Sequence, residues 1–340
     1  MLVDVYARER VKEKVKEKIK NSEWGIFYGP DLTSFLNWPD FPTKLLIALY
    51  KYKPDELGFE IPDEVKQENV YEQILISADK STRGIPYHNL GHFQRTLFDA
   101  RKAIEEIEEL AGELFPEAVK QAVYLGVAGH DYNHTGSTYL REHEKSRKYR
   151  SVEGRSAHRV ENILRKKGYH PLFRATALNI IWASTFGGQK IGIDVQPKSF
   201  FGTLMRLVDV LPSNDFSTAV AEHSKLMYGE EPAFPPPDTL DGVIQDRLSF
   251  IDHYIIPTLN SFNEATEHLL SDLSPFSEAS RNRLREQLDN NTLTARLGWD
   301  RRLAEHRKLY EIALRDQKSI ERAIISSSLR QVRELNKEDR

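Results

Sequence analysis

The sequence predicts an all-α protein, and three observations support this fold class. Most segments longer than ten residues repeat their apolar positions with the period of a helix. Only one short stretch, KIGIDV at residues 190–195, alternates apolar and polar side chains, and it could be a hairpin strand or an extended loop. Prolines gather in segments such as EEPAFPPPDT at residues 230–239, where four prolines exclude a helix.

The expected helices begin near the N-terminus. Val11, Val15 and Ile19 recur every fourth residue among lysines and glutamates, which indicates a surface helix with one buried stripe. A basic helix lying on a membrane is the alternative, but the interspersed glutamates favour the plain amphipathic helix. Residues 117–136 then predict a second helix, which Thr135 and Gly136 should end.

Further helices follow in the second half of the chain. Residues 158–168 read as a helix closed by its final glycine, and residues 172–184 read as an apolar helix. Residues 201–211 form another apolar segment, which Pro212 should stop. From about Ser274 the chain becomes strongly charged and keeps a helical pattern to its end.

Composition limits the class of protein. The chain has 340 residues, of which 39% are hydrophobic and 29% charged, and its formal net charge is −3, as expected of a folded protein in solution. That balance predicts neither a nucleic-acid polymer nor a membrane surface as partner. No signal peptide is expected, and no stretch approaches the ~18 uncharged apolar residues of a membrane span.

The chain contains no cysteine, which excludes disulfides, thiolate nucleophiles and cysteine-ligated zinc and suits a reducing cytosol. We therefore expect a cytoplasmic protein. No repeat of about 20–50 residues and no Gly/Ser linker divides the chain. We predict one domain made of an N-terminal helical subregion (1–70), a metal-binding catalytic core (71–275) and charged C-terminal helices (276–340).

Histidines and aspartates stand in unusual places within this pattern. His88 and His92 are four residues apart, so both would share one face of a helix, and His130 and His134 continue the apolar stripe of residues 117–136. Asp209 interrupts an otherwise apolar window, where an unpaired carboxylate would cost several kcal/mol.

A metal ion would satisfy the Asp209 carboxylate, together with His92, His130 and Asp131. Each motif alone is common by chance, but the combination predicts a metal site at the centre of a helical bundle. Imidazole and carboxylate ligands suit zinc, iron, manganese or magnesium, and two bridged ions would suit hydrolysis of a phosphate ester.

These motifs resemble those of the HD superfamily of metal-dependent phosphohydrolases, and within it the class I 3′,5′-cyclic nucleotide phosphodiesterases. YHNLGH (87–92) is similar to the family's Tyr-His-Asn-x-x-His, and GHDYNHTG (129–136) resembles its His-Asp-x-x-His-Pro-Gly. Glu153 lies where the family has the glutamate of Glu-Asn-His-His, and RLVDVLPSN (206–214) resembles its Ala-Asp-Leu-Ser. RLSFIDHYIIPTL (247–259) is similar to the segment that lies beside the substrate base.

The resemblance implies a two-metal site. His92, His130, Asp131 and Asp209 would hold a first, tightly bound ion, expected to be Zn²⁺. Asp131 would bridge to a second and more exchangeable ion, Mg²⁺ or Mn²⁺, whose other ligands would be mostly waters. A hydroxide between the two ions would attack phosphorus.

The resemblance also implies roles for the surrounding residues. His88 would be the general acid that protonates the leaving oxygen, Glu153 would orient it, and His134 would support the site by a hydrogen bond. At the substrate we expect four residues, namely Tyr87, Asn89, Arg247 and Phe250.

Several positions depart from the family's pattern. Arg247 replaces the glutamine that reads a purine edge, although Phe250 could still stack on a base. Arg247 offers only donors, so it could read guanine or pair with an extra phosphate, and a surface ion pair with Asp246 is the alternative. Phe93 stands where the family commonly has a small residue, and Thr135 replaces a proline.

The leading hypothesis is a phosphodiesterase that hydrolyses a 3′,5′-cyclic nucleotide to the 5′-monophosphate. The same chemistry on another phosphoester, such as a cyclic dinucleotide or a nucleoside monophosphate, is the close competitor. A non-catalytic nucleotide sensor and a purely structural helical protein are two further hypotheses, from different classes of protein. The charged end helices could mediate formation of a homodimer.

Overall fold

The computed structural model describes residues 74, 88, 90–115, 117–132, 152–169, 171–185, 199–211, 239–270, 276–289, 291–316, 318–319 and 322. Every element in these ranges is helical and none is a strand, which confirms the predicted all-α class. The helices are α6 (Leu90–Ala111), α7 (Glu117–Gly129), α8 (Val152–Lys166), α9 (Pro171–Ala183), α11 (Phe200–Val210), α13 (Leu240–Phe250), the π-helical segment η5 (Ile251–Ile255), α14 (Ile256–Glu267), the short η6 (His268–Leu270), α15 (Glu278–Leu288), α16 (Leu293–Arg296) and α17 (Trp299–Arg315).

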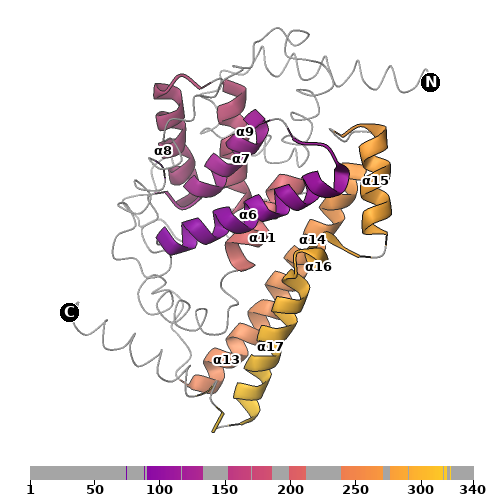
Figure 1. Ribbon diagram of the computed structural model, residues 1–340. Helices are drawn as coiled ribbons and strands as arrows, with labels where there is room; N and C mark the ends of the chain where they lie inside the picture. Colours follow the sequence, from indigo (N-terminus) through magenta and orange to yellow (C-terminus); the bar gives the residue numbers. More distant parts are fainter. Residues whose placement is uncertain are drawn as a thin grey trace, which may run out of the picture.

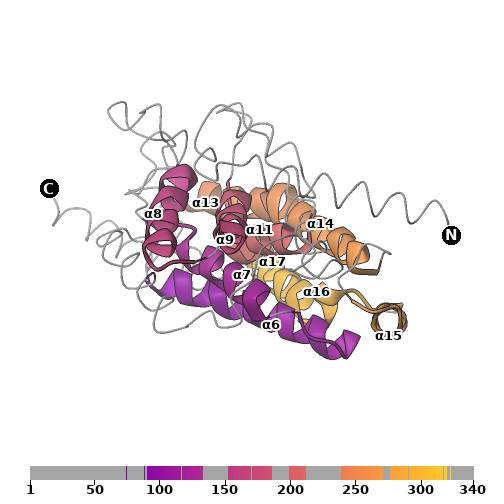
Figure 2. The same ribbon diagram turned by 90° about the horizontal axis from the view of Figure 1, so that it is seen from above.

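The long helix α6 runs across the front of the described helices in the view of Figure 1, and Figure 2 shows it along their edge. Helices α7, α8 and α9 pack together on one side of it, and α11 contacts α6, α9 and α14. On the other side, α13, η5 and α14 form one continuous rod, and α17 runs back beside α13 (Figures 1 and 2). Helix α15 packs against α6 near its C-terminal end.

Two clusters of buried apolar side chains hold these layers together. The larger lies among α6, α11, α13, α14 and α17, and the smaller among α7, α8 and α9. Helix α7 belongs to both, because Val123 packs into the larger cluster and Leu125 into the smaller. The end of α7 is therefore fixed from two sides, which matters for the residues that follow it.

Close packing of α7 against α9 depends on Gly126. A Cβ atom at this position would lie 2.5 Å from the Cβ of Ile180 and 2.6 Å from the carbonyl oxygen of Ala177. An alanine would push the two helices apart at a cost of about 1–3 kcal/mol.

Three predicted helix ends agree with the structure. Gly168 follows α8 in the left-handed region with φ +78°, α9 ends within one residue of Ser184, and α11 ends at Val210, before Pro212. Helix α11 also has a well-formed start, because the Ser199 hydroxyl accepts a hydrogen bond from the Gly202 N–H at 3.1 Å.

Two helix predictions were wrong in their bounds. Helix α7 ends at Gly129 and not at Thr135 and Gly136, so His130 and Asp131 lie in the turn that follows it. Helix α6 begins at Leu90, so His88 precedes this helix and does not share its face with His92 as a helical neighbour.

Other predictions fall outside the described residues: the N-terminal amphipathic helix, KIGIDV, all of EEPAFPPPDT except Thr239, and the last charged segment. The proposed subregions therefore stay predictions. Within the part of the chain that the structure describes, no helix has the length and apolar character needed to cross a membrane.

Candidate metal centre

Four side chains from three parts of the fold converge on one point: His92, His130, Asp131 and Asp209. His92 lies in the first turn of α6, His130 and Asp131 in the turn after α7, and Asp209 near the C-terminal end of α11. Each offers one nitrogen or oxygen atom, and these atoms all lie within 4.8 Å of one another.

The distances match the coordination sphere of a single ion. Nε2 of His92 lies 3.3 Å from Nε2 of His130, and Oδ1 of Asp209 lies 3.2 Å from each of these nitrogens. Oδ2 of Asp131 lies 2.8 Å from Nε2 of His130 and 3.5 Å from Nε2 of His92. Ligand atoms about 2.1 Å from one metal ion are about 3.0–3.4 Å apart, so this group needs little movement to hold an ion.

The early end of α7 sets the orientation of His130. Its Nδ1 lies 2.7 Å from the carbonyl oxygen of Val127, one of the carbonyls that a helix leaves unpaired in its last turn. An Nδ1–H that donates to this carbonyl leaves Nε2, which faces the two aspartates, as the nitrogen that could bind a metal ion.

Burial and opposite charge act against each other in this group. Burial lowers the pKa of His130, but the nearby carboxylates of Asp131 and Asp209 raise it by more. The pKa of His130 therefore lies well above its usual value. Burial raises the pKa of Asp131, but His130 and His88 hold it well below its usual range. Burial also raises the pKa of Asp209, but the interaction with His130 lowers it by more, so the pKa of Asp209 lies below its usual value. Both carboxylates therefore remain anionic and attract positive charge.

The donor set fits a divalent cation. Oδ2 of Asp131 is buried and accepts no well-aligned hydrogen bond from the described residues, although imidazole nitrogens surround it. The Nε2 atoms of His92 and His130 lie 3.3 Å apart, and both are close to the two carboxylates. A cation between these four atoms would satisfy them together, so this group could hold a metal ion.

His88 borders the group on its more open side. Its Nε2 lies 3.7 Å from Oδ2 of Asp131, and its ring centroid lies 5.8 Å from that of His92. The side chain of His88 is 13% exposed, against 2% for His92. The His88 imidazole is therefore partly exposed beside the cluster, and its role as general acid stays a prediction.

Arg247 and Phe250 form a stack on the rod of α13 and η5. The guanidinium carbon of Arg247 lies 4.7 Å from the ring centroid of Phe250, and that ring stacks on Tyr254 with centroids 5.2 Å apart and planes 6° apart. The guanidinium of Arg247 lies 4.0 Å from the Asp246 carboxylate, so the predicted ion pair is present. Arg247 itself is only 3% exposed, so its side chain does not lie on the surface. The stack with Tyr254 was not predicted.

The remaining predicted residues divide into two sets. Glu153 lies partly buried in the first turn of α8, and its role stays a prediction. Tyr87, Asn89 and His134 lie outside the described residues.

Phe93 lies beside the four ligand residues, a contact that was not predicted. Phe93 stood out in the sequence only because the resembled family commonly has a small residue at this position. Phe93 is fully buried, and its ring packs edge-on against both His92 and His130. Its large apolar side chain directly after a predicted ligand was the available signal.

No protein-family model matches the chain, and no curated protein is significantly similar to it. The resemblance to HD-superfamily phosphohydrolases therefore stays a prediction that rests on the motifs themselves.

Proposed function

We propose that this protein is a metal-dependent phosphodiesterase that hydrolyses a 3′,5′-cyclic nucleotide to the 5′-monophosphate. The observation that carries the proposal is the convergence of four ligand atoms within 4.8 Å of one another, with the imidazole of His88 beside them. A purely structural bundle would have no need to bury two carboxylates in such a group.

The ligand group would hold a first ion, Zn²⁺ by preference, and Asp131 would also contact a second ion, Mg²⁺ or Mn²⁺. Bound ions of this kind supply Lewis acidity and lower the pKa of a coordinated water.

His88 would carry the proton for the leaving oxygen on Nε2, the atom that lies 3.7 Å from the Asp131 carboxylate. Glu153 would keep His88 protonated and oriented, and His134 would support the site by a hydrogen bond.

Substrate recognition would fall to Tyr87, Asn89, Arg247 and Phe250. A second candidate substrate is a phosphoester with an additional anionic group, such as a cyclic dinucleotide. The buried guanidinium of Arg247 favours it, because this side chain offers only donors where the resembled family has an amide.

The test is hydrolysis of a substrate panel by the purified protein in the presence of Zn²⁺, Mn²⁺ or Mg²⁺. The panel contains cyclic AMP, cyclic GMP, a cyclic dinucleotide and an aryl phosphodiester. Asp131→Ala serves as the inactive control, and Glu109→Gln, an exposed substitution at the far end of α6, as the active control.

Metal-dependent turnover of a cyclic mononucleotide that Asp131→Ala abolishes would support the proposal. Turnover of the dinucleotide alone would transfer it to the second candidate. A protein that binds metal but hydrolyses no member of the panel would refute it and favour a nucleotide sensor.

A further inference from the structure

We infer that Phe93 is a positioning residue, whose ring holds the imidazoles of His92 and His130 in the orientation that directs both Nε2 atoms at one ion. This inference rests on the metal-binding part of the proposed function and requires neither a particular substrate nor catalysis.

The three rings form a closed triangle. The centroid of Phe93 lies 6.0 Å from that of His92 and 6.0 Å from that of His130, and the two histidine centroids lie 5.3 Å apart. The plane of Phe93 stands at 60° to His92 and at 90° to His130. Such edge-to-face contacts are favoured between aromatic rings and contribute about 0.5–1.5 kcal/mol each beyond the area buried.

Helix geometry explains how one residue reaches both histidines. Successive residues of an α-helix project about 100° apart, so Phe93 and His92 leave α6 in different directions. Phe93 is 0% exposed and fills the interior beside His130, while His92 approaches the same point from its own side. The ring therefore occupies space into which either imidazole could otherwise rotate.

Restriction of this rotation matters more at a metal site than elsewhere in a core. An imidazole has a broad preference about its second side-chain torsion, so its nitrogen is directed by contacts and not by the torsion itself. His130 has a polar anchor at Val127, but an anchor at one nitrogen still allows the ring to tilt. The ring of Phe93 supplies the steric limit, and its apolar surface keeps water from the inner side of the cluster.

The experiment compares Phe93→Leu with Phe262→Leu. Phe262 is also 0% exposed, but it packs against Phe200 and Trp299 in the larger apolar cluster and contacts none of the four ligands through its ring. Both substitutions remove an aromatic ring from the interior, so both should lower the free energy of unfolding. Phe93→Met is the second variant, because it nearly conserves volume while removing the ring.

Two quantities are measured on each purified full-length variant, well below its unfolding temperature. The first is the Kd for Zn²⁺, obtained by competition with a chelator. The second is the visible absorption spectrum of the Co²⁺-loaded protein, which reports the geometry of the ligands. We expect Phe93→Leu and Phe93→Met to weaken Zn²⁺ binding about 10–100-fold, as loss of a partner that orients a ligand does. Their Co²⁺ spectra should change, and Phe262→Leu should leave both quantities as in the wild type.

Wild-type Zn²⁺ affinity and an unchanged Co²⁺ spectrum in either Phe93 variant would overturn the inference. Equal weakening in Phe262→Leu would also overturn it, because general loss of stability would then explain the effect. A wild-type protein that binds neither ion would refute it together with the proposed function. Normal Zn²⁺ binding without turnover of any phosphodiester would refute only the proposed function.

Discussion

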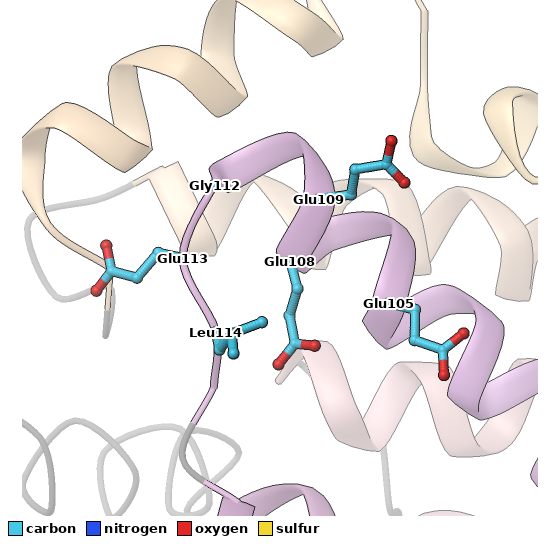
Figure 3. A pocket seen from close by; sticks show the side chains of 6 residues that line it. All are labelled: Glu105, Glu108, Glu109, Gly112, Glu113 and Leu114. Atoms are coloured by element: carbon cyan, nitrogen blue, oxygen red, sulfur yellow. The ribbon is translucent and has the colours of Figure 1, made fainter.

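Helix α6 joins two carboxylate-rich regions of the molecule, one at each end. At its N-terminal end His92 meets His130, Asp131 and Asp209 in the candidate metal centre. At its C-terminal end lies a pocket of about 400 Å³, shown in Figure 3, which is lined by Glu105, Glu108, Glu109, Gly112, Glu113 and Leu114. The second region contains more carboxylates than the first, so a count of acidic residues would favour it as a cation site.

The protein itself satisfies the less exposed carboxylates of this acidic pocket. Glu108 accepts a hydrogen bond from the Phe115 N–H at 2.8 Å and lies 3.2 Å from the Lys120 ammonium. Glu113 accepts a hydrogen bond from the Ser277 N–H at 2.9 Å. The other two glutamates of the pocket are exposed to water.

At the N-terminal end the balance of donors and acceptors differs. Carboxylate oxygens and imidazole nitrogens converge there, and Oδ2 of Asp131 accepts no well-aligned hydrogen bond from the described residues. The comparison indicates that a candidate cation site depends on imidazole nitrogens and carboxylate oxygens that converge on one buried point, and not on negative charge alone.

The largest expected effect is on Zn²⁺ affinity, which should depend on residues at the N-terminal end of α6 and not on those at its C-terminal end. Asp209→Asn keeps the shape of the side chain but removes its charge, and it should weaken Zn²⁺ binding by more than about 100-fold, since even partners that only orient a ligand account for 10–100-fold. Glu109→Gln should leave the Kd unchanged. Chelator competition measures the Kd of both variants.

Thermal unfolding gives an independent check of the same contrast. A ligand at 100 times its Kd stabilises a protein by about 2.7 kcal/mol, so Zn²⁺ should raise the midpoint of the wild type and of Glu109→Gln, and a chelator should reverse the rise. Equal Zn²⁺ affinity and equal thermal shifts in Asp209→Asn and the wild type would show that the four-residue group is not the site.

The next prediction tests, within the candidate metal centre, whether His88 acts as a proton donor and not as a metal ligand. His88→Ala should reduce turnover by about 100-fold or more and leave the metal content unchanged, because His88 lies 3.7 Å from Asp131 and outside the ligand group. Steady-state kinetics and metal analysis of the same preparation measure both quantities. Full activity, or loss of the metal with the side chain, would contradict the assignment of His88 as an acid.

Much of the fold could be predicted because the helix signals are local. Gly168 and Pro212 mark helix ends by backbone chemistry that needs no knowledge of tertiary contacts. The end of α7 could not be predicted this way, since the apolar period continues through His130. The turn after Gly129 places Nδ1 of His130 2.7 Å from the Val127 carbonyl oxygen, and the hydrophobic period does not reveal this contact.

The ligand group could be predicted because carboxylates in apolar windows require a partner. Asp209 is the plainest case, and the described structure brings it to His92 and His130. Contacts that depend on exact geometry were not predicted. The contacts of the Phe93 ring with His92 and His130 are of this kind. The stack of Phe250 on Tyr254 is not, because residues four apart are neighbours on a helix, and their spacing was an unused signal.

A smaller effect tests the C-terminal region of α6 as a purely structural one. Glu108→Ala leaves the buried Phe115 N–H without its acceptor and should lower the free energy of unfolding by about 1–3 kcal/mol. Glu108→Gln keeps an acceptor oxygen and should cost less. Urea unfolding measures both differences, and a changed Zn²⁺ affinity in either variant would break the distinction between the two ends.

The smallest effect concerns the pH dependence of the link between α6 and α15. Burial raises the pKa of Glu113, but hydrogen bonds with Ser280 and Ser277 lower it by more than burial raises it. The pKa of Glu113 in the folded protein therefore lies below the unfolded value of 4.5. The unfolded chain therefore binds the proton more readily, and the stabilisation is present above pH 4.5 and is lost as the pH falls through the folded pKa. Glu113→Gln should be less stable than the wild type by under about 1 kcal/mol near neutral pH, and the difference should shrink below pH 4.5. Urea unfolding of the two proteins in parallel cancels the titration of every other group, and a difference that stays constant across this range would show that the Glu113 charge contributes nothing.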